Sequence, residues 1–266
     1  MIKRLLIILL LSITSLQALA ENAFNHTQWD QLLKRHVINI NHGVATEVDY
    51  QGMAKERATL KVYLDKLSRV SQVTFDQWDK SQQLAFLINA YNAWTVEFIL
   101  TRYPDIKSIK DLGSFLRSPW SKTFIPLFGK MLSLDDIEQD LIRHSGRYND
   151  PRIHFAVNCA SIGCPALRAE AYSAAKLDEQ LKDQTRLFLS DHRRNRLKKD
   201  ELQVSSIFKW YREDFEKGWQ GIHSIQELFI QHAEEMGLNK ADVENIQAGK
   251  IEFEFLDYNW LLNDKK

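Results

Sequence analysis

The chain has 266 residues, of which 44% are hydrophobic, and its 35 basic residues equal its 35 acidic ones. This length and apolar content suffice for one large domain with a sizeable core, and no linker, repeat or low-complexity tract divides the sequence. The balanced charge excludes a general nucleic-acid binder, which would show a basic excess. We interpret the basic run 192–199 as a solvated loop rather than a site for an anionic partner.

The N-terminus has the three parts of a secretory signal peptide. Lys3 and Arg4 precede an apolar run, and Ala18-Leu19-Ala20 offers small residues to a signal peptidase. We therefore predict a signal peptide over residues 1–20 and a mature domain over 21–266, with an uncleaved anchor as the alternative. Export would be to the periplasm or the extracellular space. No later segment has the roughly 18 apolar residues of a membrane span.

Apolar spacing predicts several helices in the first part of the chain. They cover residues 26–41, with Gly43 as a stop, and residues 60–67, with a short extended piece at 48–50 between them. Thr74 is the expected cap of a further helix. A long helix follows from about Ser81 to Arg102, and it is apolar on nearly every face, which indicates a buried central position.

The polar residues of this long helix are Asn89, Tyr91, Asn92 and Glu97. Buried amides must find hydrogen-bond partners, so structural bonds to neighbouring loops are one interpretation. Asn89 and Asn92 lie three residues apart on one helix face, and the alternative is that they line a pocket.

The middle of the chain alternates hairpin, helix and strand patterns. Residues 124–134 read as a hairpin with Gly129-Lys130 at the turn. Ser133 then precedes a helix whose acids, including Glu138, fall in the first turn, where the helix dipole favours negative charge. Residues 152–158 alternate apolar and other residues, which predicts a strand with His154 and Asn158 on the same face.

The last third predicts a helix over 177–189, a hairpin over 197–204, helices at 205–215 and 224–236, and an alternating tail at 251–262. We expect an α+β fold, a predominantly helical single domain with a small, mostly antiparallel sheet. The late aromatic residues are more typical of a core than of a ligand platform: Trp210, Tyr211, Phe215, Trp219, Tyr258 and Trp260.

The segment Asp150–Pro165 holds both cysteines, Cys159 and Cys164, beside His154, Asn158 and Ser161. An even cysteine count in an exported protein favours a disulfide. Its loop is short, so we expect a stabilisation of roughly 2 kcal/mol or less. A metal site using both cysteines and His154, or two inert thiols, are the remaining structural interpretations.

A thiol nucleophile is the chemical alternative. Cys159 would be the nucleophile, His154 its base and Glu138 the residue that orients His154. Asn89, Asn92 or Asn158 would donate to an oxyanion in an acyl-transfer reaction. If the strand continued, His154 and Cys159 would lie about 16 Å apart on opposite faces, so this site requires a sharp turn near Asn158.

Several blocks resemble the bacterial branch of the uncharacterised family called domain of unknown function 547. They are LAFLINAYNAWTV (84–96), SLDDIEQDLIR (133–143), DPRIHFAVNCASIGCPAL (150–167), SSIFKWYREDF (205–215) and YNWLLN (258–263), and HGVATEVDY (42–50) also fits. Leu87 departs from a common tryptophan. The resemblance implies an exported bacterial domain with no established reaction. In similar plant proteins the position of Cys159 tends to remain cysteine and that of Cys164 does not, which favours a separate role for Cys159.

Two hypotheses follow from the sequence. One is a thiol-dependent acyl-transfer enzyme of the cell envelope, a hydrolase or transglutaminase-like protein, that uses Cys159 with Asn89, Tyr91, Asn92, Asn158 and Ser161 around its substrate. The other is a non-enzymatic exported binding or assembly domain with a structural Cys159–Cys164 disulfide. We expect no nucleotide cofactor, because the sequence has no glycine-rich phosphate loop, and no metal, because the two cysteines are farther apart than in the usual structural zinc sites. The partner is an unidentified envelope protein or a small substrate.

Overall fold

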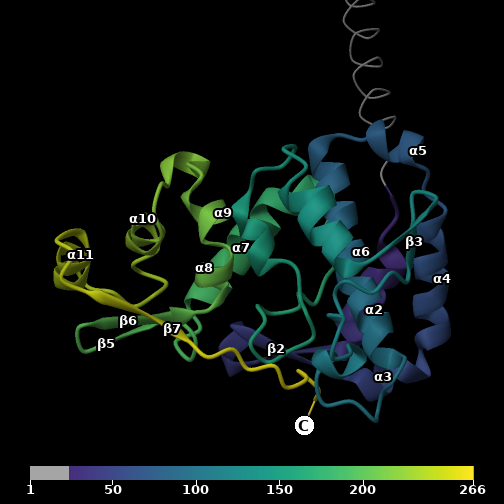
Figure 1. Ribbon diagram of the computed structural model, residues 1–266, viewed down its shortest axis with the longest axis horizontal. Helices are drawn as coiled ribbons and strands as arrows, with labels where there is room; N and C mark the ends of the chain where they lie inside the picture. Colours follow the sequence, from purple (N-terminus) through teal and green to yellow (C-terminus); the bar gives the residue numbers. More distant parts are fainter. Residues whose placement is uncertain (1–23, 266) are drawn as a thin grey trace, which may run out of the picture.

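The computed structural model describes residues 24–265 (Figure 1). Its buried apolar side chains form two cores. The predicted signal peptide over 1–20 lies outside the described residues. The first core gathers helices from the N-terminal half, and the second lies beneath a small sheet near the C-terminus. The α-helices are α2 (Thr27–His36), α3 (Tyr50–Lys55), α4 (Arg57–Ser68), α5 (Gln72–Asp76), α6 (Lys80–Leu100), α7 (Leu177–Leu189), α8 (Ile207–Trp210), α9 (Arg212–Glu216), α10 (Ile225–Gln231) and α11 (Lys240–Gln247).

Helix α6 is the centre of the first core, as its apolar sequence predicts. Every residue from Gln83 to Leu100 is buried. Asp79 and Gln82 form a reciprocal capping box at its start, which satisfies two backbone N–H groups. Helix α4 and the π-helix η3 (Asp136–Arg143) pack against α6. None of the helices within residues 24–265 is long and apolar enough to cross a membrane.

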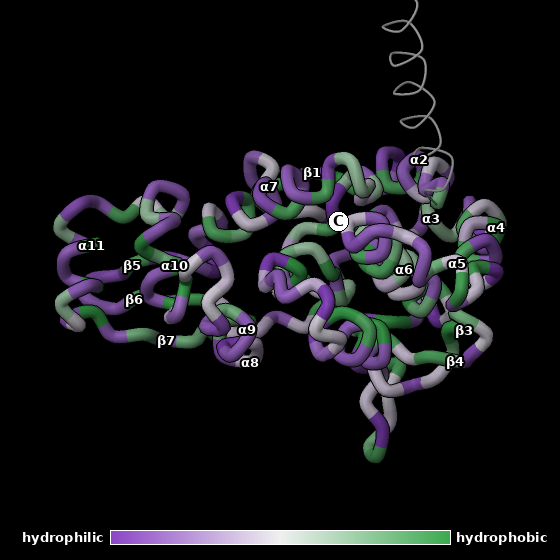
Figure 2. Tube along the Cα trace, turned by 90° about the horizontal axis from the view of Figure 1, so that it is seen from above, coloured by the Kyte–Doolittle hydropathy of each residue, from purple (hydrophilic) through white to green (hydrophobic). Residues whose placement is uncertain are grey.

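The strands form three small sheets, as expected for a helical α+β fold. Two of them are antiparallel pairs, and the third has the order β5-β6-β7 with β7 parallel to β6. The strands are β1 (Val37–Ile40), β2 (Ala45–Val48), β3 (Ile125–Leu127), β4 (Lys130–Leu132), β5 (Arg196–Lys198), β6 (Glu201–Ser205) and β7 (Glu252–Leu256). Figure 2 shows the third sheet with α10 and α11 at one end of the molecule.

The segment after β7 returns to the first core and joins the two halves. The Val48 amide donates to the carbonyl oxygen of Asn263 at 2.8 Å, and the Tyr50 hydroxyl donates to the side chain of Asn263 at 2.9 Å. The Ile162 amide donates to the carbonyl oxygen of Leu261 at 2.8 Å. The tail therefore lies beside the cysteine segment, although about 100 residues separate them in sequence.

The predicted strand over 152–158 is wrong. Residues Pro151–Phe155 form the 3₁₀ helix η4, which Asp150 caps by accepting from the Arg152 amide, with proline at the first position. The Asn92 side chain satisfies the backbone after η4, as a neighbouring strand would. It donates to Ala156 O at 3.0 Å and accepts the Asn158 amide at 2.8 Å. The alternation reflected burial on every side rather than two faces of a sheet.

Three smaller predictions also differ from the structure. Ser71, not Thr74, caps α5, because its hydroxyl accepts the Thr74 amide. The helix predicted over 26–41 ends at His36 and continues as β1. The basic run is not simply solvated: Arg193 and Arg194 both pair with the buried Asp191, and Arg194 donates to the carbonyl oxygens of Gly163 and Cys164. Arg194 thus holds the cysteine segment.

Candidate functional site

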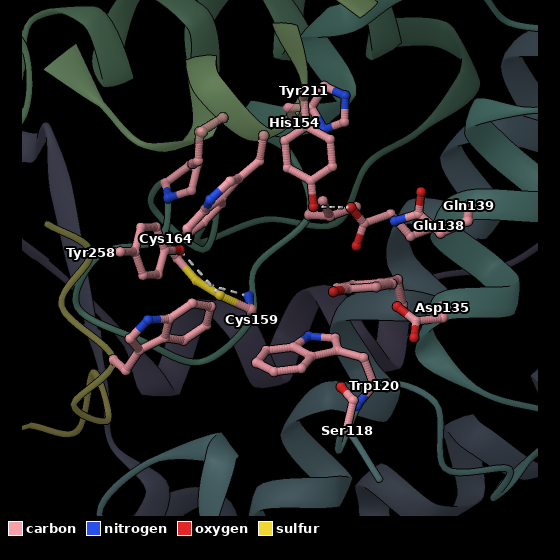
Figure 3. Close-up of a pocket in the computed structure, with 16 residues that line it drawn as sticks. Ser118, Trp120, Asp135, Glu138, Gln139, His154, Cys159, Cys164, Tyr211 and Tyr258 are labelled. Carbon is pink, nitrogen blue, oxygen red and sulfur yellow. Dashed lines mark hydrogen bonds between the residues drawn. A yellow bond between two sulfur atoms is a disulfide. The ribbon is translucent and has the colours of Figure 1, made fainter. Parts of the chain in front are cut away.

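A pocket of about 220 Å³ opens where the two cores meet the cysteine segment (Figure 3). Carboxylates lie on one side of it and the disulfide on the opposite side. We call Asp135, Glu138 and Gln139 the acid wall. Cys159, Cys164 and Tyr258 form the sulfur wall, and Trp120, Trp210 and Trp260 form the aromatic wall. The remaining lining residues are Tyr91, Ser118, His154, Val157, Pro165, Ile207 and Tyr211.

The acid wall projects from the start of η3. The Ser133 hydroxyl accepts the Asp136 amide, and the Asp136 carboxylate accepts the Ser133 amide, which fixes the first turn. Asp135 and Glu138 are three residues apart, and both line the pocket. Glu138 is only 4% exposed, and its Oε1 accepts the Tyr211 hydroxyl at 2.7 Å. Figure 3 shows this bond at the pocket surface. Glu138 is therefore more than a helix N-terminal acid.

Burial and like charges shift the pKa values at the acid wall. Burial raises the pKa of Asp135, and the nearby carboxylates of Glu138, Asp136 and Asp140 raise it further. Burial, with the Glu138 carboxylate, also raises the pKa values of Tyr91 and Tyr211, so both phenols stay protonated. The wall thus presents negative charge beside neutral hydroxyl donors.

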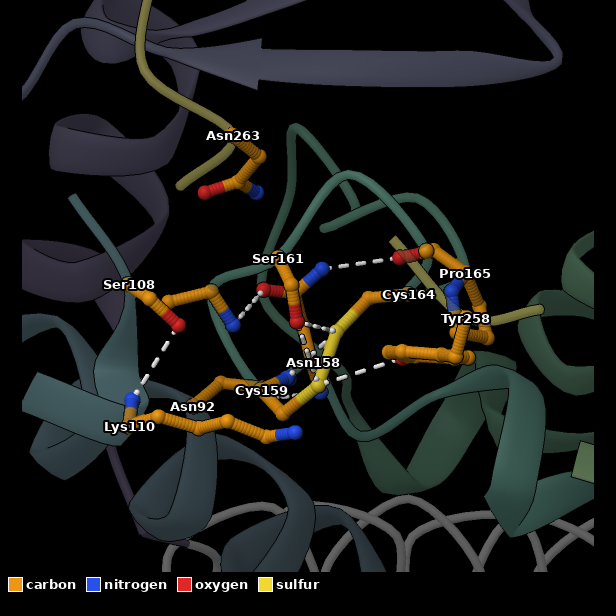
Figure 4. The surroundings of a disulfide bond; sticks show 12 residues. Asn92, Ser108, Lys110, Asn158, Cys159, Ser161, Cys164, Pro165, Tyr258 and Asn263 are labelled. Atoms are coloured by element: carbon orange, nitrogen blue, oxygen red, sulfur yellow. Dashed lines mark hydrogen bonds between the residues drawn. A yellow bond between two sulfur atoms is a disulfide. The ribbon is translucent and has the colours of Figure 1, made fainter. Parts of the chain in front are cut away.

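The sulfur wall contains a disulfide between Cys159 and Cys164. The Ser161 and Tyr258 hydroxyls lie 3.1 and 3.2 Å from the Cys159 sulfur (Figure 4). Gly163 permits this packing, because a Cβ atom there would lie 2.8 Å from the Tyr258 ring. The bonded sulfurs overturn the interpretations as a metal site and as inert thiols. They also mean that Cys159 is no free nucleophile in this state.

Asn158 holds the turn that the thiol hypothesis required. Its side chain donates to Pro165 O at 2.7 Å and accepts the Ala160 amide at 2.9 Å. Ala160 adopts a positive φ of 60°, an uncommon conformation for a non-glycine residue, at the sharpest point of the segment. These bonds turn the chain so that Cys159 and His154 line the same pocket.

His154 pairs with Asp214, and not with Glu138 as predicted. Its Nε2 lies 2.8 Å from the Asp214 carboxylate, which Arg143 and Lys217 also contact. Burial lowers the pKa of His154, whereas hydrogen bonds from these three residues overcome burial and hold the pKa of Asp214 far below its usual value. A neutral His154 therefore donates its Nε2 proton to an ionised Asp214.

The other ring nitrogen of His154 carries a lone pair. Among residues 24–265, Nδ1 has no hydrogen-bond partner, and the side chain is fully buried. The imidazole stacks on Tyr211 with the ring centroids 3.8 Å apart. A buried acceptor without a partner is uncommon in proteins.

The aromatic wall contradicts part of the expectation that the late aromatic residues form core. Trp210 is 47% exposed, and it stacks on Trp260 with the centroids 5.8 Å apart. Tyr258 lies 4.5 Å from Trp260, and Trp120 crosses Trp260 edge-on at 5.4 Å. Phe215 is buried in the second core, and Trp219 packs against it, as predicted. The ammonium of Lys110 lies 3.9 Å from the Trp260 ring centroid.

The three predicted asparagines do not line the pocket. Asn89 donates to Tyr172 O at 2.8 Å and accepts the Tyr172 amide at 3.0 Å, while Asn92 and Asn158 bond the backbone as described above. Their amides are thus used in structural bonds, and none is free to stabilise an oxyanion. Ser161 contacts the sulfurs. Tyr91 is the predicted binding residue that reaches the cavity.

Sequence reasoning missed Ser118, Trp120, Asp135 and Asp214 as site residues. Trp120 follows Ser118-Pro119 in a loop, and a tryptophan in a polar loop is an available signal. Asp135 reads as an ordinary acid near a helix start. Asp214 has no sequence signal, because 60 residues separate it from His154. Within residues 24–265, no three His, Cys, Asp or Glu side chains gather as metal ligands.

One family model matches the chain, and it covers residues 75–189. No curated protein and no solved structure matches the chain significantly. The matched region contains the acid wall, both cysteines and His154, whereas Trp210, Tyr258 and Trp260 lie outside it. Residues 75–189, with the buried helix and the cysteine segment that the resemblance rests on, belong to the family described as "Protein of unknown function, DUF547".

Proposed function

We propose that this protein binds a small ligand in the pocket, with the Cys159–Cys164 bond as a structural clip. The observation that carries this proposal is the cavity of about 220 Å³, in which carboxylates and hydroxyls converge among aromatic rings. Concave sites with a mainly apolar lining and a few converging polar groups are typical of ligand binding.

The disulfide supports this function by fixing the shape of the sulfur wall. Five positions separate the two cysteines, so the bond constrains a small loop and contributes modestly to global stability, on the order of 2 kcal/mol or less. Its local effect is larger, because the loop also holds Tyr258 through Gly163. The clip thereby keeps one wall of the cavity in place.

Export is part of the proposal. The pattern of Lys3 and Arg4, an apolar run and Ala18-Leu19-Ala20 supports a signal peptide. A disulfide between the only two cysteines fits an oxidising compartment such as the periplasm. Cell fractionation with N-terminal sequencing of the mature chain tests this part, and Glu21 is the expected first residue.

One observation favours a second function, thiol-dependent acyl transfer. After reduction of the bond by an external dithiol, the Ser161 and Tyr258 hydroxyls would remain beside the Cys159 sulfur and could stabilise a thiolate. The unpartnered Nδ1 of neutral His154 would be the proton acceptor on the same pocket. This function needs the reduced protein, whereas ligand binding needs the bonded one.

Thiol trapping separates the two functions. The mature protein is purified from its export compartment without reductant, alkylated and weighed. We expect no added label and a mass two hydrogens below that of the reduced chain. Two labelled sulfurs, with Cys159 reacting faster at low pH, would instead favour acyl transfer, and Cys159→Ser would be the control for its activity.

A pocket-filling variant tests ligand binding. Thermal unfolding is followed with four groups of probes: alkyl amines, alcohols, carboxylates and methyl glycosides. We expect one group to raise the melting temperature of the wild type and of Val73→Trp, a control at a 69% exposed position that does not line the pocket. The same group should have no effect on Ser118→Trp, in which the indole fills the cavity. No stabilising group, or an unaffected Ser118→Trp, would refute the proposal.

A further inference from the structure

The charged side chains that line the pocket are all acidic. Its lining contains the carboxylates of Asp135 and Glu138 but no lysine or arginine. Neither carboxylate has an ion-pair partner among residues 24–265. Arg143 lies behind this wall: its guanidinium donates to Gln139, pairs with Asp214 and lies 4.8 Å from the Tyr211 ring centroid, but it forms no ion pair with Asp135 or Glu138. Glu138 is buried and Asp135 is half-buried, and a desolvated carboxylate without a paired cation is costly, so this site favours a positively charged occupant.

The hydrogen-bonding groups point to the same occupant. Asp135 and Glu138, which line the cavity, offer only acceptor oxygens when they are ionised. The hydroxyls of Tyr91 and Tyr211 are the donors nearest to Glu138, and Tyr211 already donates to it. An occupant that satisfies the remaining acceptors must itself be rich in N–H donors.

The aromatic wall fits a cation as well. A cation within about 6 Å of a tryptophan ring centroid is attracted by the ring's quadrupole. The protein already shows this interaction at Trp260, where the Lys110 ammonium lies 3.9 Å from the ring centroid. Trp210 and Trp120 extend the same surface to the pocket lining.

We propose that the pocket recognises the ammonium or guanidinium group of a small amine or of a basic side chain. This inference rests on the proposed ligand-binding function and names its ligand class. The cationic group lies between the acid wall and the aromatic wall, donates to Asp135 and Glu138, and leaves its alkyl stem along the tryptophans. A cavity of about 220 Å³ accommodates one such head group with a short stem.

Four probes of similar shape test the charge requirement: butylguanidinium, butylammonium, butanol and butyrate. Their affinities are measured by calorimetric titration of the intact, oxidised protein at pH 7. We expect both cations to bind at least about tenfold more tightly than butanol, which corresponds to about 1.4 kcal/mol. Butyrate should not bind. A capped Gly-Lys-Gly peptide distinguishes a basic side chain from a free amine, because the peptide binds only if the pocket admits a backbone at its mouth.

Three variants test which side chains provide the preference for cations. Glu138→Gln and Asp135→Asn should each weaken butylguanidinium binding at least about tenfold, because each leaves the cation less neutralised. Asp140→Asn is the matched control, since Asp140 is exposed on the same helix and does not line the pocket. If Glu138→Gln does not fold, Asp135→Asn and the pH profile of the wild type still decide the inference.

The pH profile has a defined direction. Ionised Asp135 faces the carboxylates of Glu138, Asp136 and Asp140, and burial together with these like charges raises its pKa. Cation affinity should therefore fall as pH decreases, beginning at a higher pH than for an ordinary aspartate, and Asp135→Asn should remove that early fall. Equal binding of butanol and the cations, or unchanged affinity in both acid-wall variants, would overturn the inference.

The ligand class and the function fail in different ways. If methyl glycosides or butanol bind in the wild type and lose binding in Ser118→Trp, the pocket is a ligand site but its ligand is not a cation. If no probe binds the wild type, the proposed function itself is refuted.

Discussion

The acid wall and the aromatic wall differ in how the structure holds them. Glu138 is 4% exposed and hydrogen-bonded to Tyr211, and the neighbouring His154 is fixed by a buried Asp214. Trp210, in the aromatic wall, is 47% exposed, and its side chain contacts the rings of Tyr258 and Trp260 without a hydrogen bond among the described residues. Directional bonds fix charged groups in one geometry, whereas stacked rings can shift with little cost.

The two walls also differ in where their residues lie relative to the family-matched region. Asp135, Glu138 and both cysteines lie within the family-matched region 75–189, but Trp210 and Trp260 lie beyond it. The comparison teaches that the pocket joins a fixed, charged side that lies wholly within residues 75–189 to an adaptable apolar side, of which Trp120 lies in the same region and Trp210 and Trp260 lie in the rest of the chain. Substitutions on the two sides should therefore have different signatures in stability and in binding.

The largest effect is expected behind the acid wall, from Asp214→Asn. This change removes the anion that Arg143, His154 and Lys217 share, so we expect a loss of about 3 kcal/mol in the free energy of unfolding. Urea unfolding at pH 7 measures it. Asp178→Asn is the control, because Asp178 is 84% exposed and its pairing with Arg152 should contribute less than about 1 kcal/mol.

The pH dependence of this loss follows from the lowered pKa of folded Asp214. Its stabilisation is present above the pKa of the unfolded chain, about 4, and is lost as pH falls from there toward the folded pKa. The difference between wild type and Asp214→Asn should shrink as the pH is lowered below about 4. A difference that stays constant with pH would show that Asp214 acts through packing and not through charge.

A smaller effect is expected at the contact between the cysteine segment and the tail. Gly163→Ala would place a methyl group 2.8 Å from the Tyr258 ring, which must move. We expect a loss of roughly 1–3 kcal/mol and a weaker affinity for the probes, because Tyr258 belongs to the sulfur wall. Gly146→Ala is unsuitable as a control, because Gly146 has a positive φ that disfavours alanine. The control is therefore Ser121→Ala on the exposed surface. Unchanged affinity for the probes in Gly163→Ala would show that Tyr258 does not take part in binding.

The smallest effect on stability is expected at the aromatic wall. Trp210→Ala removes a half-exposed ring, so the free energy of unfolding should change by about 1 kcal/mol or less. The affinity for butylguanidinium should nevertheless fall several-fold, because a cation–ring contact contributes about 0.5–1 kcal/mol. Calorimetric titration beside urea unfolding measures both. A Trp210→Ala variant that loses stability but keeps its affinity for butylguanidinium would contradict this difference between the two walls.

The sequence predicted the parts of the fold that depend on local patterns. The burial of α6, the hairpin after Phe124 and the capping role of Ser133 all follow from apolar spacing and turn residues. The disulfide was one of the alternatives that the sequence left open. These features involve residues that are close together in the chain.

The sequence failed where distant residues compete with a local pattern. The stretch around His154 alternates like a strand, but the amide of Asn92 from α6 satisfies its backbone and leaves it in η4 and a turn. Likewise, the partner of His154 lies 60 residues away, and Trp260 reaches the pocket only because the tail returns to the first core. No periodicity within a short window contains that information.

The return of the tail also sets the order in which the pocket is completed during synthesis. Tyr258 and Trp260 are added after nearly every other lining residue, and the tail that carries them is anchored at Asn263 to Tyr50, 213 positions earlier. A nascent chain that has emerged only as far as β7 therefore has the acid wall and both cysteines but lacks two of the surrounding rings. Oxidation of the cysteines can precede closure, whereas ligand capture must wait for the finished protein.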